Sequence, residues 1–315
     1  MSELGIGIHP DIAPALYHAD GMTAEPSLSS SIIKTLLNQS PEHARDRHPR
    51  LTASPSYKWP ETDAMRVGNV AHSMLLGAGA KYKTFYPSDY RTAKGEVSKT
   101  LGCAEAQAAI AAWNAQGGID IAEKTLLDAT AVTDHMLALI REDYPMWDTG
   151  QSEVTLIFEY RLNDQSTITC KARPDRMVEN CRCVESNDPH LHLYDPKFSG
   201  RLMTDSWIDR TAEADGWGIQ DAFYSFGTEK LTGHTPLFTF IVGELFPPYT
   251  TRFVTLPDGW KQDARSDVDR AANVWGACIK TGVWPNRTPR HYVPTRPAWA
   301  TDRELTDLIE TLPEE

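Results

Sequence analysis

The stretches TITCKARPDRMV at residues 167–178 and LHLYDPK at residues 191–197 decide the fold of this chain. Each is a short run with apolar residues at alternating or successive positions, and polar turn residues separate the two at Asn187-Asp188-Pro189. The run EVTLIFEYRL at residues 153–162 precedes them and is rich in β-branched and aromatic residues. Together the three runs predict neighbouring strands joined by polar turns.

Helices are expected on both sides of this strand cluster in the sequence. Before it, the pattern predicts helices over 27–38 and 66–76, a proline-rich loop over 46–63, and two alanine-rich helices over 104–142 that break near Gly117-Gly118. After it, the pattern predicts a helix over 206–226, strands over 236–245 and 250–256, and a long helix over 259–281. This order of elements predicts an α/β (α+β) fold with a central mixed β-sheet flanked by helices.

The length of 315 residues allows one large domain with extensions. We expect an irregular N-terminal segment over residues 1–26, a single domain over residues 27–290, and a C-terminal tail over residues 291–315. No internal repeat or long low-complexity tract divides the chain.

The composition is ordinary for a globular protein, with 41% hydrophobic and 23% charged residues. No apolar run approaches the roughly 20 residues that cross a bilayer, and residues 1–10 lack the basic and apolar regions of a secretory signal. A cytoplasmic protein without a membrane partner is therefore expected. The net charge of −12 argues against a protein that coats nucleic acid non-specifically, although an acidic body can carry a local basic lining.

Five cysteines are spread along the chain, at positions 103, 170, 181, 183 and 278. Their odd number and irregular spacing argue against a disulfide framework and a four-cysteine iron–sulfur cluster, and they indicate reduced thiols. Cys181 and Cys183 are closer than the usual zinc-knuckle pair and have no second pair. His190 and His192 flank the second motif, but their spacing alone is weak support for a second metal.

Asp175, Asp195 and Lys197 are the residues that indicate chemistry. Because residues i and i+2 of a strand point to the same face, Asp195 and Lys197 project together. If the strand of Asp175 pairs beside them, one cluster holds two carboxylates and one ammonium. Carboxylates hold Mg²⁺ or Mn²⁺, and an ammonium can orient water or stabilise a charged transition state, which suits phosphodiester hydrolysis. Taken alone, the three residues could equally form a surface salt bridge between strands.

The order of several segments resembles the PD-(D/E)XK nuclease superfamily, in particular its RecE-type branch, which includes the exonuclease VIII C-terminal domain and related prophage proteins. The matching segments are LSSSIIK at 28–34 with Ser40-Pro41, GNVAHSMLL at 68–76, SEV at 152–154, RPD at 173–175, DPK at 195–197 and QDAFY at 220–224. The stretch over 275–284 also resembles the closing helix of the family. This resemblance covers roughly residues 20–290 and implies a restriction-endonuclease-like core with a helical N-terminal extension.

The resemblance also implies a metal site. Its ligands for Mg²⁺, which Mn²⁺ could replace, would be His72, Asp175, Asp195 and the backbone carbonyl of Pro196. Lys197 would be the catalytic lysine beside the catalytic acids Asp175 and Asp195. Without this family context, a histidine such as His72 on an apolar helix is more often a packed core residue.

Further residues are placed around this site by the same resemblance. Glu153 would lie near the metal or the attacking water, with a solvated strand end as the alternative. Gln220 and Tyr224 share one helix face at i, i+4 spacing and would contact DNA or brace the site. Arg173 and Arg66 are further candidates for DNA binding or bracing, and Arg66, like Arg45, Arg47, Arg50 and Lys94, could instead be a solvated surface charge.

Two positions depart from the family pattern. The residue after the lysine is usually threonine, and here it is Phe198. The middle residue of the D-x-K motif is Pro196, which is awkward inside a sheet because it lacks an N–H donor. Both leave the expected ligands intact, and both concern the local geometry of the strand.

The expected activity is that of a Mg²⁺-dependent exodeoxyribonuclease acting on the ends of linear double-stranded DNA. The resemblance implies 5′-to-3′ polarity, phage-type recombination with a single-strand annealing recombinase as partner, and a ring-like homo-oligomer. No G-x-x-x-x-G-K-[ST] phosphate loop occurs, so no nucleotide cofactor is expected. The alternatives are another nuclease of the superfamily, such as an endonuclease or a single-strand-specific repair nuclease, and a degenerate nuclease fold that binds DNA ends.

Overall fold

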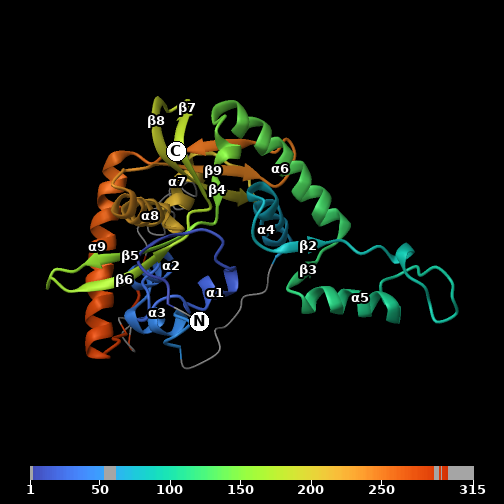
Figure 1. Cartoon of the computed structure of the whole chain (residues 1–315), viewed down its shortest axis with the longest axis horizontal. Helices are drawn as coiled ribbons and strands as arrows, with labels where there is room; N and C mark the ends of the chain where they lie inside the picture. The colour runs from blue at the N-terminus through green and yellow to red at the C-terminus, as the bar shows by residue number, and fades with distance from the viewer. Residues whose placement is uncertain (1–2, 53–61, 287–290, 292, 297–315) are drawn as a thin grey trace, which may run out of the picture.

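The computed structural model describes residues 3–52, 62–286, 291 and 293–296 (Figure 1). Its helices are α1 (Pro14–His18), α2 (Ser30–Asn38), α3 (Pro41–Arg47), α4 (Asp63–Leu76), α5 (Ala104–Ala115), α6 (Glu123–Asp143), α7 (Asp205–Ala214), α8 (Trp217–Thr232) and α9 (Asp258–Thr281). Its strands are β1 (Gly7–His9), β2 (Lys81–Lys83), β3 (Gly118–Asp120), β4 (Gln151–Ser152), β5 (Thr155–Arg161), β6 (Thr167–Ala172), β7 (Arg176–Cys183), β8 (Ser186–Ser199), β9 (Leu237–Glu244) and β10 (Thr251–Val254).

A mixed five-stranded sheet forms the centre, in the order β10-β9-β8-β7-β4. The strands β8 and β9 are parallel, and the other neighbouring pairs are antiparallel. The parallel pair requires a crossover connection, which α7 and α8 supply. A second sheet has the order β1-β5-β6. The mixed sheet flanked by helices that the sequence predicts is therefore confirmed.

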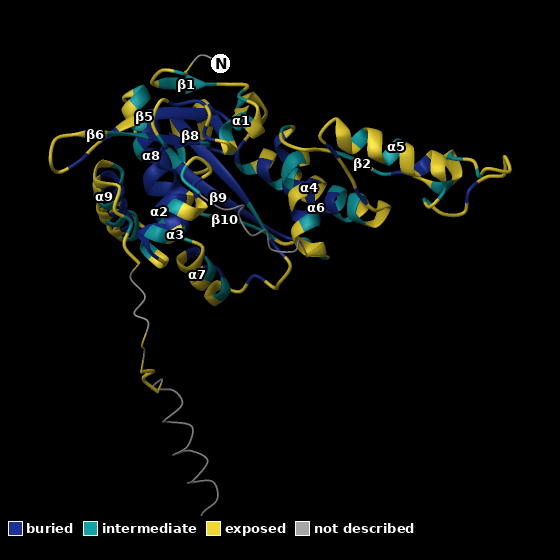
Figure 2. Ribbon diagram, turned by 90° about the horizontal axis from the view of Figure 1, so that it is seen from below, coloured by how far each residue is buried: buried dark blue, intermediate teal, exposed yellow. Residues whose placement is uncertain are grey.

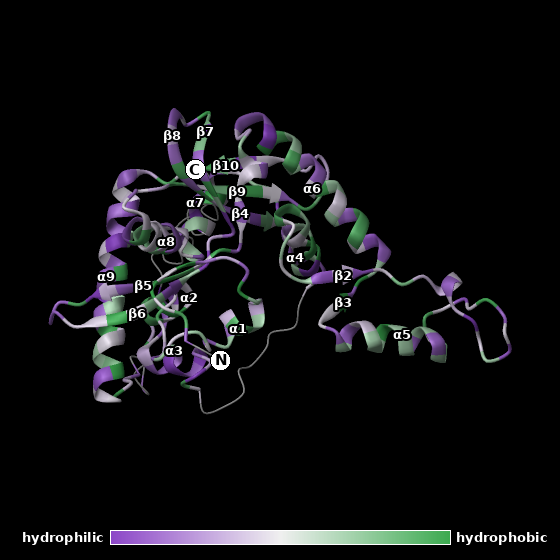
Figure 3. Ribbon diagram, in the orientation of Figure 1, coloured by the Kyte–Doolittle hydropathy of each residue, from purple (hydrophilic) through white to green (hydrophobic). Residues whose placement is uncertain are grey.

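Two apolar clusters cover opposite sides of the central sheet. One contains Phe223 of α8 and Trp275 of α9, packed with Phe240 of β9. The other contains Val70 of α4 and Met136 of α6, with residues of β8 and β9. Figure 2 shows the central strands mostly buried and the helices exposed on their outer sides. Figure 3 shows hydrophobic and hydrophilic residues mixed along α6 and α9, as expected for helices with one face on a core.

The two sheets meet at a break in two adjacent strands. Glu153 separates β4 from β5, and Asp175 separates β6 from β7. At this point the backbone N–H of Glu153 donates to the carbonyl of Asp175 at 2.9 Å. Glu153 has a φ of 51°, a left-handed conformation that a non-glycine residue adopts only at an energetic cost. The regular strand pairing is therefore interrupted at two acidic residues, Glu153 and Asp175.

Several expected boundaries differ from the structure. The helix expected over 206–226 is two helices, because Gly216 adopts a left-handed φ of 64° between α7 and α8. Residues 41–47, assigned partly to a loop, form α3, which Pro41 begins and the Ser40 side chain caps at the N–H of His43. The segment 1–26 is not wholly irregular, since it contains α1 and the strand β1, which pairs with β5. Most of the loop over 46–63 and of the tail over 291–315 lies outside the described residues.

The alanine-rich helices are found as α5 and α6, and glycines 117 and 118 lie between them. The helix α5 projects from the body together with β2 and β3 (Figures 1 and 2). Among the described residues, no helix is long and apolar enough to cross a membrane.

A buried ionic network fixes the N-terminal segment to β6. Asp20 is fully buried, and its Oδ1 lies 2.8 Å from the Nζ atom of Lys171. The other Asp20 oxygen accepts a hydrogen bond from the Ser27 N–H at 3.0 Å and lies 3.3 Å from Nε2 of His48. Burial alone would raise the pKa of Asp20, but His48 and Lys171 outweigh burial and lower that pKa to about 2.

Asp20→Asn should destabilise the fold at neutral pH by roughly 3 kcal/mol, because it leaves the buried Lys171 without its counter-charge. A carboxyl whose pKa is lowered on folding stabilises the protein above its unfolded pKa, and this contribution is lost as the pH falls through the folded value. The difference between variant and wild type should therefore shrink as the pH falls from about 4 to about 2. Urea denaturation at several pH values measures it.

The matched control is Asp148→Asn, which removes the exposed Arg141–Asp148 pair. An exposed pair contributes at most about 1 kcal/mol, so this variant should stay close to wild type. Equal losses in the two variants would contradict the structural role of Asp20.

Candidate active site

Four elements meet at the break between the sheets and bring the expected site residues together. Asp175 lies in the connection before β7, Asp195 and Lys197 lie on β8, His72 lies on α4 and Gln220 lies on α8. The strand β8 pairs with β7 only as far as Tyr194, opposite Arg176, and beyond it pairs with β9 alone. The acidic end of β8 is therefore locally an edge, open to ligands on one side.

Asp195 forms the floor of the site, with only 1% of its surface exposed. Its Oδ1 contacts the ammonium of Lys197, as the shared strand face predicts. Its Oδ2 accepts a hydrogen bond from Nε2 of Gln220. The Lys197 ammonium also donates to Oε1 of Gln220 at 3.3 Å. Gln220 thus links the acid and the lysine and fixes both side chains.

His72 and Asp175 form the rim of the site. The Nε2 atom of His72 lies 3.0 Å from Oδ2 of Asp175, and both side chains are about a quarter exposed, at 28% and 21%. The helix α4 approaches closely at Gly68, where an added Cβ would lie 3.3 Å from Cβ of Phe198. Gly68 therefore lets the helix of His72 pack against β8.

The charges in this site depend on one another. Burial raises the pKa of Asp195, against the opposing effect of Lys197, and the nearby Asp175 raises it further. Burial would lower the pKa of Lys197, but the two acids outweigh it and raise that pKa. Lys197 is therefore a charged ammonium at neutral pH and is suited to stabilising negative charge. Burial would also lower the pKa of His72, but its hydrogen bond to Asp175 and the neighbouring acids raise it.

The donor atoms suit a hard divalent cation. The Lys197 ammonium contacts the buried Oδ1 atom of Asp195, and Asp175 brings a second, partly exposed carboxylate to the depression that His72 and Lys197 also line. Cis ligands of octahedral Mg²⁺, with bonds of about 2.1 Å, lie about 3 Å apart. The 3.0 Å separation of His72 Nε2 and Asp175 Oδ2 has this value. The residues present therefore fit a Mg²⁺ or Mn²⁺ ion.

The two departures from the family pattern have a structural explanation. Pro196 lies within β8 where that strand has no partner on the β7 side, so its missing N–H is tolerated there. Phe198 packs against Gly68 of α4. Pro196, Lys197 and Phe198 line one depression together with His72 and Asp175.

Comparison with solved structures gives one informative match. A crystal structure of a candidate exonuclease from Eubacterium rectale shares the fold. It is 15% identical, has a TM-score of 0.53, and the match covers 93% of this chain and 98% of that chain. At this identity the likeness shows the fold alone, and it supports the α+β architecture described here. No family model matches the sequence, and no curated protein matches it significantly.

Glu153 and Arg173 form a group beside the site. The Nε atom of Arg173 donates to the carbonyl of Glu153 at 2.9 Å, and its guanidinium lies 3.8 Å from the Glu153 carboxylate. The same guanidinium bonds to the carbonyl of Ile12 and stacks 4.9 Å from the ring of Tyr17. These contacts favour a bracing role for Arg173, since they tie the N-terminal segment to the site.

Tyr224 and Arg66 make contacts with other residues. Tyr224 is buried on α8, where burial holds the pKa of its hydroxyl well above the usual value and Ser30 hydrogen-bonds to it. This placement favours bracing over direct contact with a ligand. Arg66 lies in the first turns of α4 and its guanidinium lies 3.6 Å from the Asp63 carboxylate.

Sequence reasoning did not assign a site role to Lys34, a residue of the LSSSIIK segment. Lys34, Arg47 and Gln220 line a second depression, which shares Lys197 with the first. Burial, and then the charge of Lys197, lower the pKa of Lys34. The amphipathic pattern of α2 could have indicated this role for Lys34. Ile32, Ile33 and Leu36 are buried, and the polar positions 31, 34, 35 and 38 fall on the side of the helix that lines this depression.

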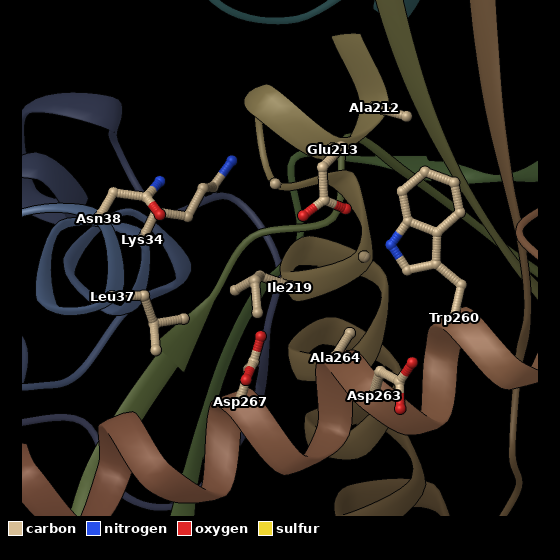
Figure 4. Close-up of a pocket in the computed structure, with 12 residues that line it drawn as sticks. Lys34, Leu37, Asn38, Ala212, Glu213, Ile219, Trp260, Asp263, Ala264 and Asp267 are labelled. Atoms are coloured by element: carbon tan, nitrogen blue, oxygen red, sulfur yellow. The ribbon is translucent and has the colours of Figure 1, made fainter. Parts of the chain in front are cut away.

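A third depression lies on the other side of Lys34, between α2 and the helices α7 to α9 (Figure 4). Glu213, Asp263 and Asp267 line it, so its charge is unfavourable for a nucleic acid. Basic residues therefore gather on the side of Lys34 that faces Lys197.

Gln220→Ala should weaken Mn²⁺ binding about 10–100-fold, because Gln220 orients the Asp195 carboxylate. Calorimetric titration of the protein with Mn²⁺ measures the affinity. The control is Gln262→Ala, which changes an exposed residue of α9 and should leave the affinity unchanged. If the affinity of Gln220→Ala equals that of wild type while both variants stay folded, the orienting role is refuted.

Proposed function

We propose that this protein is a Mg²⁺-dependent exodeoxyribonuclease that hydrolyses linear double-stranded DNA. The observation that carries the proposal is the convergence of Asp175, Asp195, Lys197 and His72 at the open end of β8, on a nuclease-like fold. Asp175, Asp195, His72 and the Pro196 carbonyl would hold the metal. When bound, Mg²⁺ neutralises charge on the scissile phosphate and lowers the pKa of a water molecule.

The side chains around the metal position would then act on substrate and water. Lys197, held by Asp195 and Gln220, is placed to stabilise the negative charge that develops on the phosphate. Glu153 lies at the break between the sheets and would accept a hydrogen bond from the attacking water. Gln220 keeps Lys197 oriented and would contact the DNA backbone from α8.

The path of the DNA strand follows the two depressions that share Lys197. Lys34, Arg47 and Lys197 line the second depression with one acid, Asp215, so basic side chains outnumber acidic ones at the proposed position of the phosphates. This local basic lining suits an anionic substrate despite the net charge of −12. The 5′-to-3′ polarity, the ring-like homo-oligomer, and the role in phage-type recombination with an annealing recombinase rest on the family resemblance.

Lys197→Met should reduce Mg²⁺-dependent degradation of linear duplex DNA by about 10²–10³-fold, because it removes the charge that stabilises the transition state. Release of acid-soluble nucleotides measures the rate. The control is Lys230→Met, an exposed lysine in the last turn of α8, which should retain full activity.

The choice of substrate tests the exonuclease proposal itself. Linear duplex DNA should be degraded, and covalently closed circles should remain intact. Digestion of circles would identify an endonuclease instead, and inactivity of folded wild-type protein in every divalent metal would favour a DNA-end-binding scaffold. Full activity in Lys197→Met would refute the proposed mechanism.

Lys34→Ala combined with Arg47→Ala should weaken DNA binding and reduce its dependence on salt. Each lost phosphate contact lowers the slope of log affinity against log salt by about 0.9. Fluorescence anisotropy with a linear duplex in Ca²⁺, at several salt concentrations, measures this slope. Arg161→Ala, an exposed residue at the end of β5, is the control and should keep the wild-type slope. An unchanged slope in the double variant would exclude this DNA path.

A further inference from the structure

Two cysteines and two histidines meet on the hairpin formed by β7 and β8. Cys181, Cys183, His190 and His192 each present one potential ligand atom, and these atoms all lie within 4.8 Å of one another. Both cysteines and His192 are buried, and His190 is half-buried. None of the four belongs to the proposed nuclease site.

The hydrogen bonds of the histidines leave two lone pairs facing each other. Nδ1 of His190 lies 2.8 Å from the carbonyl of Asp188, which can only accept, so Nδ1 carries the proton. Nε2 of His190 is then unprotonated in the neutral ring. The hydroxyl of Thr239 donates to Glu185 at 2.7 Å, so it accepts from Nε2 of His192 at 2.8 Å. Nδ1 of His192 is therefore also unprotonated.

These two unprotonated nitrogens lie 3.1 Å apart, and no hydrogen can satisfy both neutral rings. A cation between the two nitrogens resolves the repulsion of their lone pairs. Thr239, backed by Glu185, and the Asp188 carbonyl supply the outer hydrogen bonds that orient metal-binding histidines.

The sulfur atoms of the two cysteines lie close to the two histidine nitrogens. Sγ of Cys183 lies 3.7 Å from Nε2 of His190 and 3.8 Å from Nδ1 of His192. Sγ of Cys181 lies 3.4 Å from the hydroxyl of Tyr194, which can donate a hydrogen bond to a thiolate.

We propose that these four residues bind a structural zinc ion. In a tetrahedral site with Zn–N bonds of about 2.0–2.1 Å and Zn–S bonds of about 2.3 Å, ligand atoms lie about 3.3–3.8 Å apart. The separations of 3.7 and 3.8 Å between Cys183 Sγ and the two histidine nitrogens fall within that range, and the 3.1 Å between the two nitrogens is slightly shorter. Four protein ligands of the two-cysteine, two-histidine type close the coordination sphere, which is typical of a structural rather than a catalytic zinc.

A β-bulge explains why the spacing of the cysteines does not resemble a zinc motif. Val178 pairs with His192 and Cys181 pairs with His190, so β7 has one residue more than β8 between these two pairs. Asn180 absorbs the extra residue with a left-handed φ of 53°. The bulge brings Cys181 and Cys183 to the side of the hairpin where the two histidines lie.

The zinc would clamp the two strands that carry the proposed nuclease residues. Asp175 immediately precedes β7, and Asp195 lies on β8 three residues after His192. Figure 1 shows β7 and β8 side by side at the upper edge of the molecule, near α6. Because successive residues of a strand point to opposite faces, His192 and Asp195 project to different sides of β8.

Metal analysis of the wild-type protein, purified under reducing conditions without metal-affinity steps, tests the proposal. We expect about one tightly bound zinc per chain by plasma mass spectrometry. Protein produced with Co²⁺ should show thiolate-to-cobalt charge-transfer absorption and the ligand-field bands of tetrahedral cobalt. These readouts do not depend on nuclease activity.

Cys181→Ser and His190→Asn should lose the zinc and the cobalt spectrum. Two controls should keep both: Cys278→Ser, which changes a buried cysteine of α9, and Asp175→Asn, which changes the proposed nuclease site. Folded wild-type protein without stoichiometric zinc and without the cobalt spectrum would overturn the proposal. Zinc retained by Cys181→Ser and His190→Asn, or lost in Asp175→Asn, would also overturn it.

Discussion

The buried carboxylate of Asp195 is the constraint on which the rest of the site depends. A carboxylate removed from water is stable only with a counter-charge and hydrogen-bond donors. Lys197 supplies the charge from the same strand, and Gln220 supplies a donor from α8. The need for these partners links β8 to the helix α8. It also places the pair of Asp195 and Lys197 at the open end of the strand, where the second acid, Asp175, lines the same depression as Lys197. A divalent cation would satisfy all of these groups.

The break between the two sheets places the second half of the site. Glu153 and Asp175 follow the ends of β4 and β6, and neither residue belongs to a strand. One backbone hydrogen bond joins them, from the N–H of Glu153 to the carbonyl of Asp175. His72 reaches Asp175 because Gly68 allows α4 to pack on Phe198. The N-terminal segment is held near this break by Asp20 and Lys171, whose ion pair is buried. The ion pair that stabilises the N-terminal segment and the contacts that position Asp175 therefore lie in the same part of the fold.

Local periodicity predicted the strands β5, β8, β9 and β10, the amphipathic helices, and the shared face of Asp195 and Lys197. It did not predict the short strands β1 to β4, or the division of residues 167–178 into β6 and β7. It could not predict features that depend on single backbone conformations or on distant partners. Gly216 divides a continuous helical pattern, and Asn180 shifts the alternation of β7 so that four separated residues converge. Asp20 is a polar residue in a segment expected to be irregular, and its buried contacts with His48 and with Lys171, which is far along the chain, make it a core residue. The proximity of His72 to Asp175 was expected from the family resemblance, not from spacing.

The account predicts one metal position between strand β8 and helix α4. A crystal structure with Mn²⁺, with the ion located by its anomalous scattering, tests it most directly. The expected result is a Mn²⁺ peak about 2.0–2.5 Å from carboxylate oxygens of Asp175 and Asp195, with His72 as a further ligand. A fully occupied Mn²⁺ elsewhere, with these side chains unchanged and paired among themselves, would contradict the account.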